Sequence, residues 1–168
     1  MVAEPARRAK RAVLLLAVIW AALVVLAPYT LPEGSVGDLS GKVGSLDHDL
    51  GWMNPLAQFV YLAGDLNCHT RSERSLDLNG NQMPFCARDV GLFLGLAAGM
   101  AVVFWASPRF QWWAVIALAI PIVADGTAQL ILDYESTNLV RMATGLMGGV
   151  AAAMFLGHVA DEVLQTKK

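Results

Sequence analysis

The residues with the greatest chemical capacity fall into three clusters along the chain. The first begins with a thiol and an imidazole at Cys68 and His69, and the second places Cys86 three residues before Asp89. The third is split between two segments and holds Asp125, Gln129, Glu135, Asn138 and Arg141. Thiolate, imidazole and carboxylate groups bind metal ions, and several of them also transfer protons. The sequence therefore predicts a polar site assembled from parts that lie far apart in the chain.

Cys68 and Cys86 are the two cysteines of the sequence, and three interpretations of them are open. A disulfide between them would close a loop of about 18 residues and stabilise the fold by roughly 3 kcal/mol. A zinc site would take Cys68, His69, Cys86 and Asp89 as its four ligands. Independent thiols would serve a redox or nucleophilic role. The first two interpretations both fasten the segment around Cys68 to the segment around Cys86.

Arginines accompany all three clusters, at Arg71, Arg74, Arg88 and Arg141. Guanidinium groups match phosphate oxygens, so one hypothesis is an enzyme that holds a lipid phosphate or another anionic head group. In that hypothesis His69, Asp89 and Asp125 act as acid–base or metal-binding groups. The alternative is a non-enzymatic membrane subunit or assembly factor, clamped by a disulfide or by zinc, whose arginines pair with nearby carboxylates and leave no empty cavity. A third hypothesis is a small transporter or channel component with Asp125 and Arg141 on its path, and the sequence motifs do not decide among the three.

The third cluster has helical spacing. Asp125 and Gln129 are four residues apart, and Glu135, Asn138 and Arg141 follow one another at steps of three, so each set shares one helix face. Ionisable groups inside a membrane are expensive and usually face a bundle interior or a wet cavity. We therefore expect an ion pair between Asp125 and Arg141 across a helical hairpin, in a polar cavity that Gln129, Glu135 and Asn138 also line.

Four apolar segments must position these clusters, at roughly residues 12–29, 90–106, 112–132 and 139–159. About 20 apolar residues cross a hydrocarbon core of about 30 Å as a helix. The composition agrees, since 56% of the residues are hydrophobic and 15% are charged. The expected fold is all-α: a polytopic membrane helix bundle with four transmembrane helices in a single domain, residues 1–168. Residues 30–89 are expected to form an extracytoplasmic loop with a short interfacial or re-entrant helix at 52–66 and a solvated His48.

The basic residues predict the orientation. The first apolar segment, which we interpret as a retained span, follows a basic cluster made of Arg7, Arg8, Lys10 and Arg11, and such clusters stay in the cytoplasm. Four crossings then place both termini in the cytoplasm and all three polar clusters at the outer face of the cell membrane. Gly91, Gly95 and Gly99 recur every four residues and predict a close helix–helix contact. The expected partners are membrane lipid and either further copies of the chain or a larger membrane complex; the net charge of −2 does not suggest nucleic acid.

The motifs around the cysteines resemble those of a family. The stretch from Cys68 to Ser75 fits CHxxxxRS, and the stretch from Pro84 to Gly91 fits PxCxRxxG. The resemblance, which covers roughly residues 68–149, is to an uncharacterised family of small bacterial and archaeal multi-pass membrane proteins with a domain of unknown function. It implies a membrane fold and brings no established activity. Many members look as if they carry a further cysteine where this chain has Asp89, which would complete a conventional four-ligand zinc set; a disulfide needs no residue at that position, so the departure slightly favours a disulfide.

Overall fold

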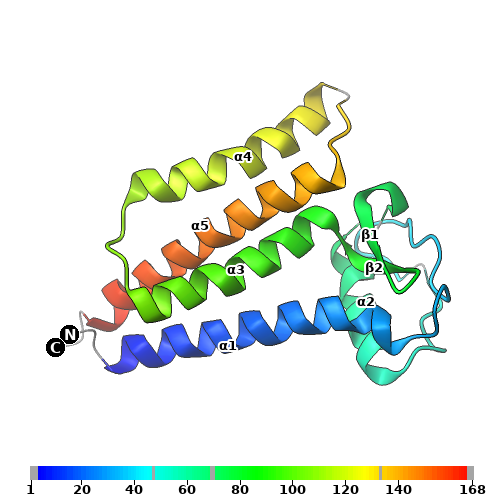
Figure 1. Ribbon diagram of the computed structural model, residues 1–168, viewed down its shortest axis with the longest axis horizontal. Coiled ribbons are helices and arrows are strands. Elements are labelled where there is room, and N and C mark those ends of the chain that lie inside the picture. Colours follow the sequence, from blue (N-terminus) through cyan, green and yellow to red (C-terminus); the bar gives the residue numbers. More distant parts are fainter. Residues whose placement is uncertain (1–3, 47, 69–70, 133, 166–168) are drawn as a thin grey trace.

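The computed structural model describes residues 4–46, 48–68, 71–132 and 134–165, and its long helices form a bundle (Figure 1). The four helices are α1 (Glu4–Leu26), α3 (Ala87–Ala106), α4 (Trp112–Ile131) and α5 (Asn138–Gln165). Within the described residues these four, with α1 extended to Thr30, are long and apolar enough to cross a membrane. The predicted all-α membrane bundle is therefore confirmed, although α1 begins eight residues before the expected first span (4 against 12) and α5 ends six residues after the expected fourth (165 against 159).

Helices α3 and α5 form the centre of the bundle, and glycines let them approach closely. A Cβ atom added at Gly95 would lie 2.1 Å from the carbonyl oxygen of Leu146, and one added at Gly145 would lie 2.1 Å from that of Arg88. Real side chains cannot occupy such positions, so the two backbones touch directly. In lipid this van der Waals contact replaces the hydrophobic effect between helices. The glycine repeat expected to mark a helix contact does so.

Helix α4 lies at the edge of the bundle beside α5 (Figure 1). Its large apolar side chains, among them Ile116, Ile120, Val123 and Leu130, are exposed on the surface of the chain. Asp125 is the buried residue of this helix. An apolar outer surface suits contact with lipid, whereas a buried carboxylate needs a partner from inside the bundle.

A cap, defined as the described residues of 27–86, covers one end of the bundle. It contains a 3₁₀ turn η1 (Ala27–Thr30), helix α2 (Pro55–Asn67), a second 3₁₀ turn η2 (Ser72–Arg74) and the antiparallel strands β1 (Ser75–Leu78) and β2 (Asn81–Cys86). Its apolar core includes Val36, Met53, Val60, Tyr61 and Met83. We call this end of the bundle the cap end. The opposite end, where α1 begins and α5 ends (Figure 1), is called the terminal end.

Helix α2 is the short helix expected at residues 52–66. The side chain of Asn54 caps it by accepting hydrogen bonds from the backbone of Leu56 and Ala57, and Pro55 occupies its first turn. Thirteen residues give a helix of about 20 Å, too short for a hydrocarbon core of about 30 Å. It packs on β2 at the cap end (Figure 1), so the interfacial interpretation fits better than a crossing.

The β-hairpin was not predicted from the sequence, although Asn79-Gly80 is a dipeptide typical of a two-residue hairpin turn. Both turn residues have positive φ, 57° and 67°, as a two-residue hairpin of type I′ requires. The hairpin places Ser75 opposite Cys86. It therefore brings the polar segment after Cys68 back to the start of α3.

Candidate functional site

The first polar group lies where the cap joins α3. Cys68 ends α2, Cys86 ends β2 and precedes α3, and Asp89 lies in the first turn of α3. One ligand atom from each residue lies within 4.8 Å of the other two. The Cys86 thiol donates to the Asp89 carboxylate over 3.2 Å. The structure thus brings together three of the four residues that the sequence offered as zinc ligands; the fourth, His69, lies outside the described residues.

The two cysteines are thiols in the structure, and the surroundings of Cys86 disfavour its ionisation. The hydrogen bond with Cys68 raises the pKa of the Cys86 thiol, as do its burial and the negative charge of Asp89. A thiol in this setting is a poor nucleophile at neutral pH, because the thiolate is the reactive form. A bound divalent cation would reverse the effect, since a thiol that coordinates a metal is deprotonated.

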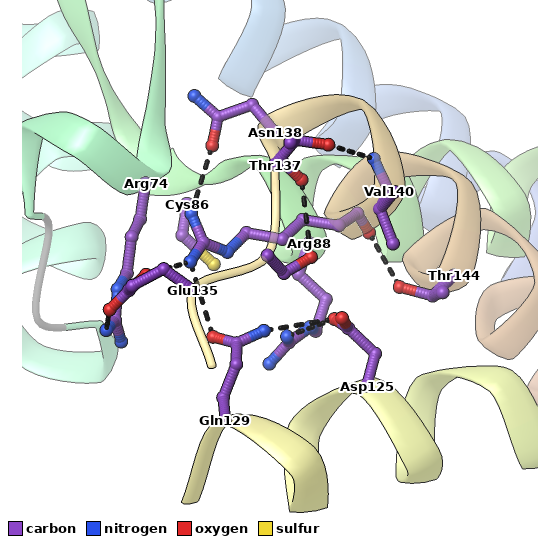
Figure 2. Close-up of polar contacts among 12 residues, drawn as sticks. Arg74, Cys86, Arg88, Asp125, Gln129, Glu135, Thr137, Asn138, Val140 and Thr144 are labelled. Atoms are coloured by element: carbon purple, nitrogen blue, oxygen red, sulfur yellow. Dashed lines mark hydrogen bonds and ion pairs between the residues drawn. The ribbon is translucent and has the colours of Figure 1, made fainter. Parts of the chain in front are cut away.

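The second polar group connects α3 to α4. Arg88, one residue before Asp89, turns the other way and forms an ion pair with Asp125 of α4 (Figure 2). Gln129 donates to the same carboxylate over 3.1 Å. Gly126 lies beside the guanidinium, since an added Cβ there would be in ordinary contact with Nη1 of Arg88 at 3.7 Å. The single buried carboxylate of α4 is therefore neutralised from the centre of the bundle.

The predicted ion pair between Asp125 and Arg141 was wrong. The amide of Gln129 stands between them, because its nitrogen donates to Asp125 and its oxygen accepts from Arg141 over 3.3 Å. The close packing of α3 on α5 explains the change of partner, since it carries the first turn of α3, and Arg88 with it, to the side of Asp125.

Arg141 is instead the centre of a third group, at the start of α5. Its side chain is 3% exposed and donates to Glu135 over 2.7 Å and to Asn138 over 3.3 Å. Glu135 also pairs with Arg74 of the cap (Figure 2), so one carboxylate serves two arginines. Both arginines, Arg74 first, lower the pKa of Glu135 below its usual value.

Asn138 adds an uncharged hydrogen bond by donating to the backbone oxygen of Ser75 in β1 over 3.0 Å. The turn between α4 and α5 is thus fastened to the cap by an ion pair and by a hydrogen bond.

The fourth predicted anion-binding arginine lies apart. Arg71 is 3.8 Å from Glu73 on the surface of the cap, where about half of its side chain is exposed. All four arginines offered as a head-group site therefore have a carboxylate within ion-pair distance: Glu73 for Arg71, Glu135 for Arg74 and Arg141, and Asp125 for Arg88. The charges of Arg74, Arg88 and Arg141 are directed toward the protein, whereas that of Arg71 lies on its surface.

Two further contacts between basic and acidic side chains were not foreseen. His48, expected to be solvated, contacts the buried Asp65 of α2 over 2.8 Å, because the loop folds back onto the cap. At the terminal end, Lys10 of α1 pairs with Asp161 of α5 over 2.6 Å and is itself buried. Neither pair had a local signal in the sequence, since the partners lie 17 and 151 residues apart.

Comparison with known proteins gives matches in this same region. The family model described as "Predicted membrane protein (DUF2085)" matches residues 68–155, just over half of the chain. An uncharacterized protein of Methanocaldococcus jannaschii is 32% identical over 115 residues, which cover 64% of this chain and 72% of that protein. One from Methanothermobacter thermautotrophicus is 32% identical over 90 residues, covering 52% and 81%. No solved structure matches the chain. The resemblance seen in the cysteine motifs is thus confirmed, and the chain belongs to the DUF2085 family of predicted membrane proteins.

Proposed function

We propose that this protein is a non-enzymatic membrane subunit in which a zinc ion, held by Cys68, Cys86 and Asp89, clamps the cap to the helix bundle. The observation that carries the proposal is the convergence of these three ligand atoms within 4.8 Å at the junction of cap and α3. A disulfide would use the two sulfurs and leave Asp89 without a role. The contact between Asp89 and Cys86 therefore favours a metal site over the disulfide. The sequence alone slightly favoured the disulfide.

The chemistry of the cluster fits zinc. Two thiols and one carboxylate are ligands that zinc accepts, and bonds of about 2.0–2.3 Å place tetrahedral ligand atoms roughly 3.3–3.8 Å apart. The observed separations of up to 4.8 Å need a contraction of about an ångström, which side-chain rotation provides. The positive charge of zinc would also offset the repulsion among the two thiolates and the carboxylate that coordinate it. His69, next to Cys68 in the sequence, is our proposed fourth ligand.

The ion pairs favour a subunit over an enzyme acting on a lipid phosphate. An anion site needs arginines whose guanidinium groups face a cavity, whereas these four face carboxylates of the chain itself. A substrate would have to displace Asp125 or Glu135 to reach Arg74, Arg88 or Arg141. The pairs instead fasten α4, α5 and the cap to one another, as a structural role requires.

We further propose that the cap lies outside the cell and that both termini are cytoplasmic. The support is the basic cluster that begins α1 at the terminal end, made of Arg7, Arg8, Lys10 and Arg11, since such residues remain on the cytoplasmic side. In this orientation the clamp would work in an oxidising compartment, where a bound metal also protects the two thiols from oxidation.

The test is metal analysis of the full-length protein, purified in detergent without chelators, together with a count of reactive thiols. We expect about one zinc per chain, and thiols that react only after chelator and denaturant are added. Cys86→Ser and Asp89→Asn should each lower the zinc content. Asp77→Asn, which changes an exposed carboxylate of the same cap, should not.

Two outcomes would overturn the metal clamp. Absence of metal with thiols that appear only after reduction would replace it with a disulfide between Cys68 and Cys86. Thiols that react in the native protein without chelator or reductant would leave no clamp of either kind. The subunit role would fail separately if the purified protein hydrolysed a lipid phosphate and Arg141→Gln abolished that hydrolysis.

A further inference from the structure

The terminal end carries a groove that the proposed clamp does not use. It has a volume of about 420 Å³ and is lined by Glu4, Arg7, Arg8 and Arg11 of α1 and by Phe104 of α3. The four α1 residues follow one another at helical spacings of three, one and three, so they share a single face. The groove therefore has a basic wall from one helix and an aromatic wall from another.

The charge of this groove differs from that of the cap end. Three arginines line it against one carboxylate, Glu4, which pairs with Arg8 over 3.1 Å. The guanidinium of Arg7 lies 5.7 Å above the ring of Phe104, a cation–π contact that holds it at the mouth of the groove. The positive end of the α1 dipole adds to the potential. The groove therefore carries an excess of positive charge.

The depth of the groove matches the phosphate level of a bilayer. The apolar part of α1 begins at Ala12, so Arg11, Arg8 and Arg7 lie about 1.5 to 7.5 Å beyond it at 1.5 Å per residue. Head groups occupy roughly the outer 5–7 Å on each side of the hydrocarbon core. All three side chains are exposed on the described chain and can reach that layer.

We propose that this groove binds the phosphate of an anionic phospholipid, with its acyl chains alongside α1 and α3. The guanidinium groups of Arg7 and Arg11, one helical turn apart, form paired hydrogen bonds to phosphate oxygens. Phe104 packs against the glycerol and the first methylene groups of the lipid. The site is at the opposite end of the bundle from the cysteines, so this proposal is tested independently of the metal clamp.

The test is lipid binding to the full-length protein in detergent, followed by native mass spectrometry. The probes are phosphatidylglycerol and phosphatidylcholine, which share the phosphate and differ in net charge. We expect phosphatidylglycerol to be retained preferentially. Each arginine near the bilayer surface contributes about a fivefold change in affinity, so Arg7→Gln with Arg11→Gln should weaken phosphatidylglycerol binding by roughly 25-fold.

A matched control separates a defined site from general surface charge. Arg109 is an exposed arginine at the same end, in the turn between α3 and α4, and does not line the groove. Arg109→Gln should leave phosphatidylglycerol binding within twofold of the original. An equal loss in Arg109→Gln and in the double variant would overturn the site. Complete displacement of the lipid by millimolar inorganic phosphate would also overturn it, because the occupant would then be free phosphate.

Discussion

The ion pair between Arg88 and Asp125 predicts a specific energetic coupling between α3 and α4. Asp125→Asn keeps the shape of the side chain and its contact with Gln129 but leaves the guanidinium of Arg88 without a counter-charge. Removing one partner of a buried pair destabilises proteins by about 3–5 kcal/mol. The side chain of Arg88 is 23% exposed, so water relieves part of the penalty. We therefore expect a loss of about 3 kcal/mol in the free energy of unfolding.

The reverse change should be more costly. Arg88→Met leaves Asp125, whose side chain is 6% exposed, with the neutral side chains of Gln129 and Ser136 as donors and no counter-charge. We expect a loss of about 4–5 kcal/mol for this variant. Since the double variant removes both charges, it should be destabilised by less than the sum of the two, with a coupling energy of about 2–3 kcal/mol.

The assay is unfolding of the detergent-solubilised protein by titration with a denaturing detergent, followed by circular dichroism. The control is the same cycle with Asp125→Asn and Arg141→Met, the pair that the sequence suggested. Arg141 reaches Asp125 only through Gln129, so that coupling should stay below about 1 kcal/mol. A larger coupling to Arg141 than to Arg88 would refute the structural assignment of the partner.

Three other predictions concern packing, pH and metal. Gly95→Ala should destabilise the bundle by about 1–3 kcal/mol because the new methyl group meets the carbonyl of Leu146. Gly126→Ala, whose new methyl group would lie 3.7 Å from its nearest neighbour, should change the free energy of unfolding by less than about 0.5 kcal/mol. Both variants are compared with the original protein by thermal unfolding. The arginines lower the pKa of Glu135, so the stabilisation by its carboxylate is complete above the usual pKa of 4.5 and is lost as the pH falls below that value. The difference in melting temperature between the original protein and Glu135→Gln should therefore vanish in acid. A difference that stays constant with pH would count against the pairing. Zinc chelation should make the cap sensitive to limited proteolysis while the long helices stay protected, whereas an unchanged cleavage pattern would show that no metal supports the cap.

The spans were predictable because a bilayer imposes one length on every helix that crosses it. A hydrocarbon core of about 30 Å demands about 20 apolar residues, and the polar turn between α3 and α4 gave their shared boundary directly. The short helix followed from the same rule, since α2 is apolar but has only 13 residues. These features depend on composition along the chain and not on which residues meet in space.

The hairpin and the ion-pair partners depend on contacts, and the sequence left them open. Strand β2 contains Pro84, is buried at five consecutive residues and runs directly into α3, so it lacks the alternating pattern that marks a half-buried strand. The partner of Asp125 depends on how α3 is rotated about its own axis. That rotation is set where Gly91 and Gly95 meet the backbone of α5. A glycine repeat indicates that two helices touch, but it does not say which arginine is turned toward a third.

The two ends of the bundle use arginine in opposite ways, and this difference follows from what surrounds them. At the cap end, folded protein covers the helix ends, so a charge there is neutralised by another side chain. Asp125 and Glu135 supply the opposite charge for three arginines. At the terminal end, the arginines of α1 stand on an exposed helix face with one carboxylate among them. Glu4 supplies counter-charge to Arg8, and for Arg7 and Arg11 a bilayer offers phosphate at that depth. The same residue type therefore builds internal structure at one end and an attachment to lipid at the other.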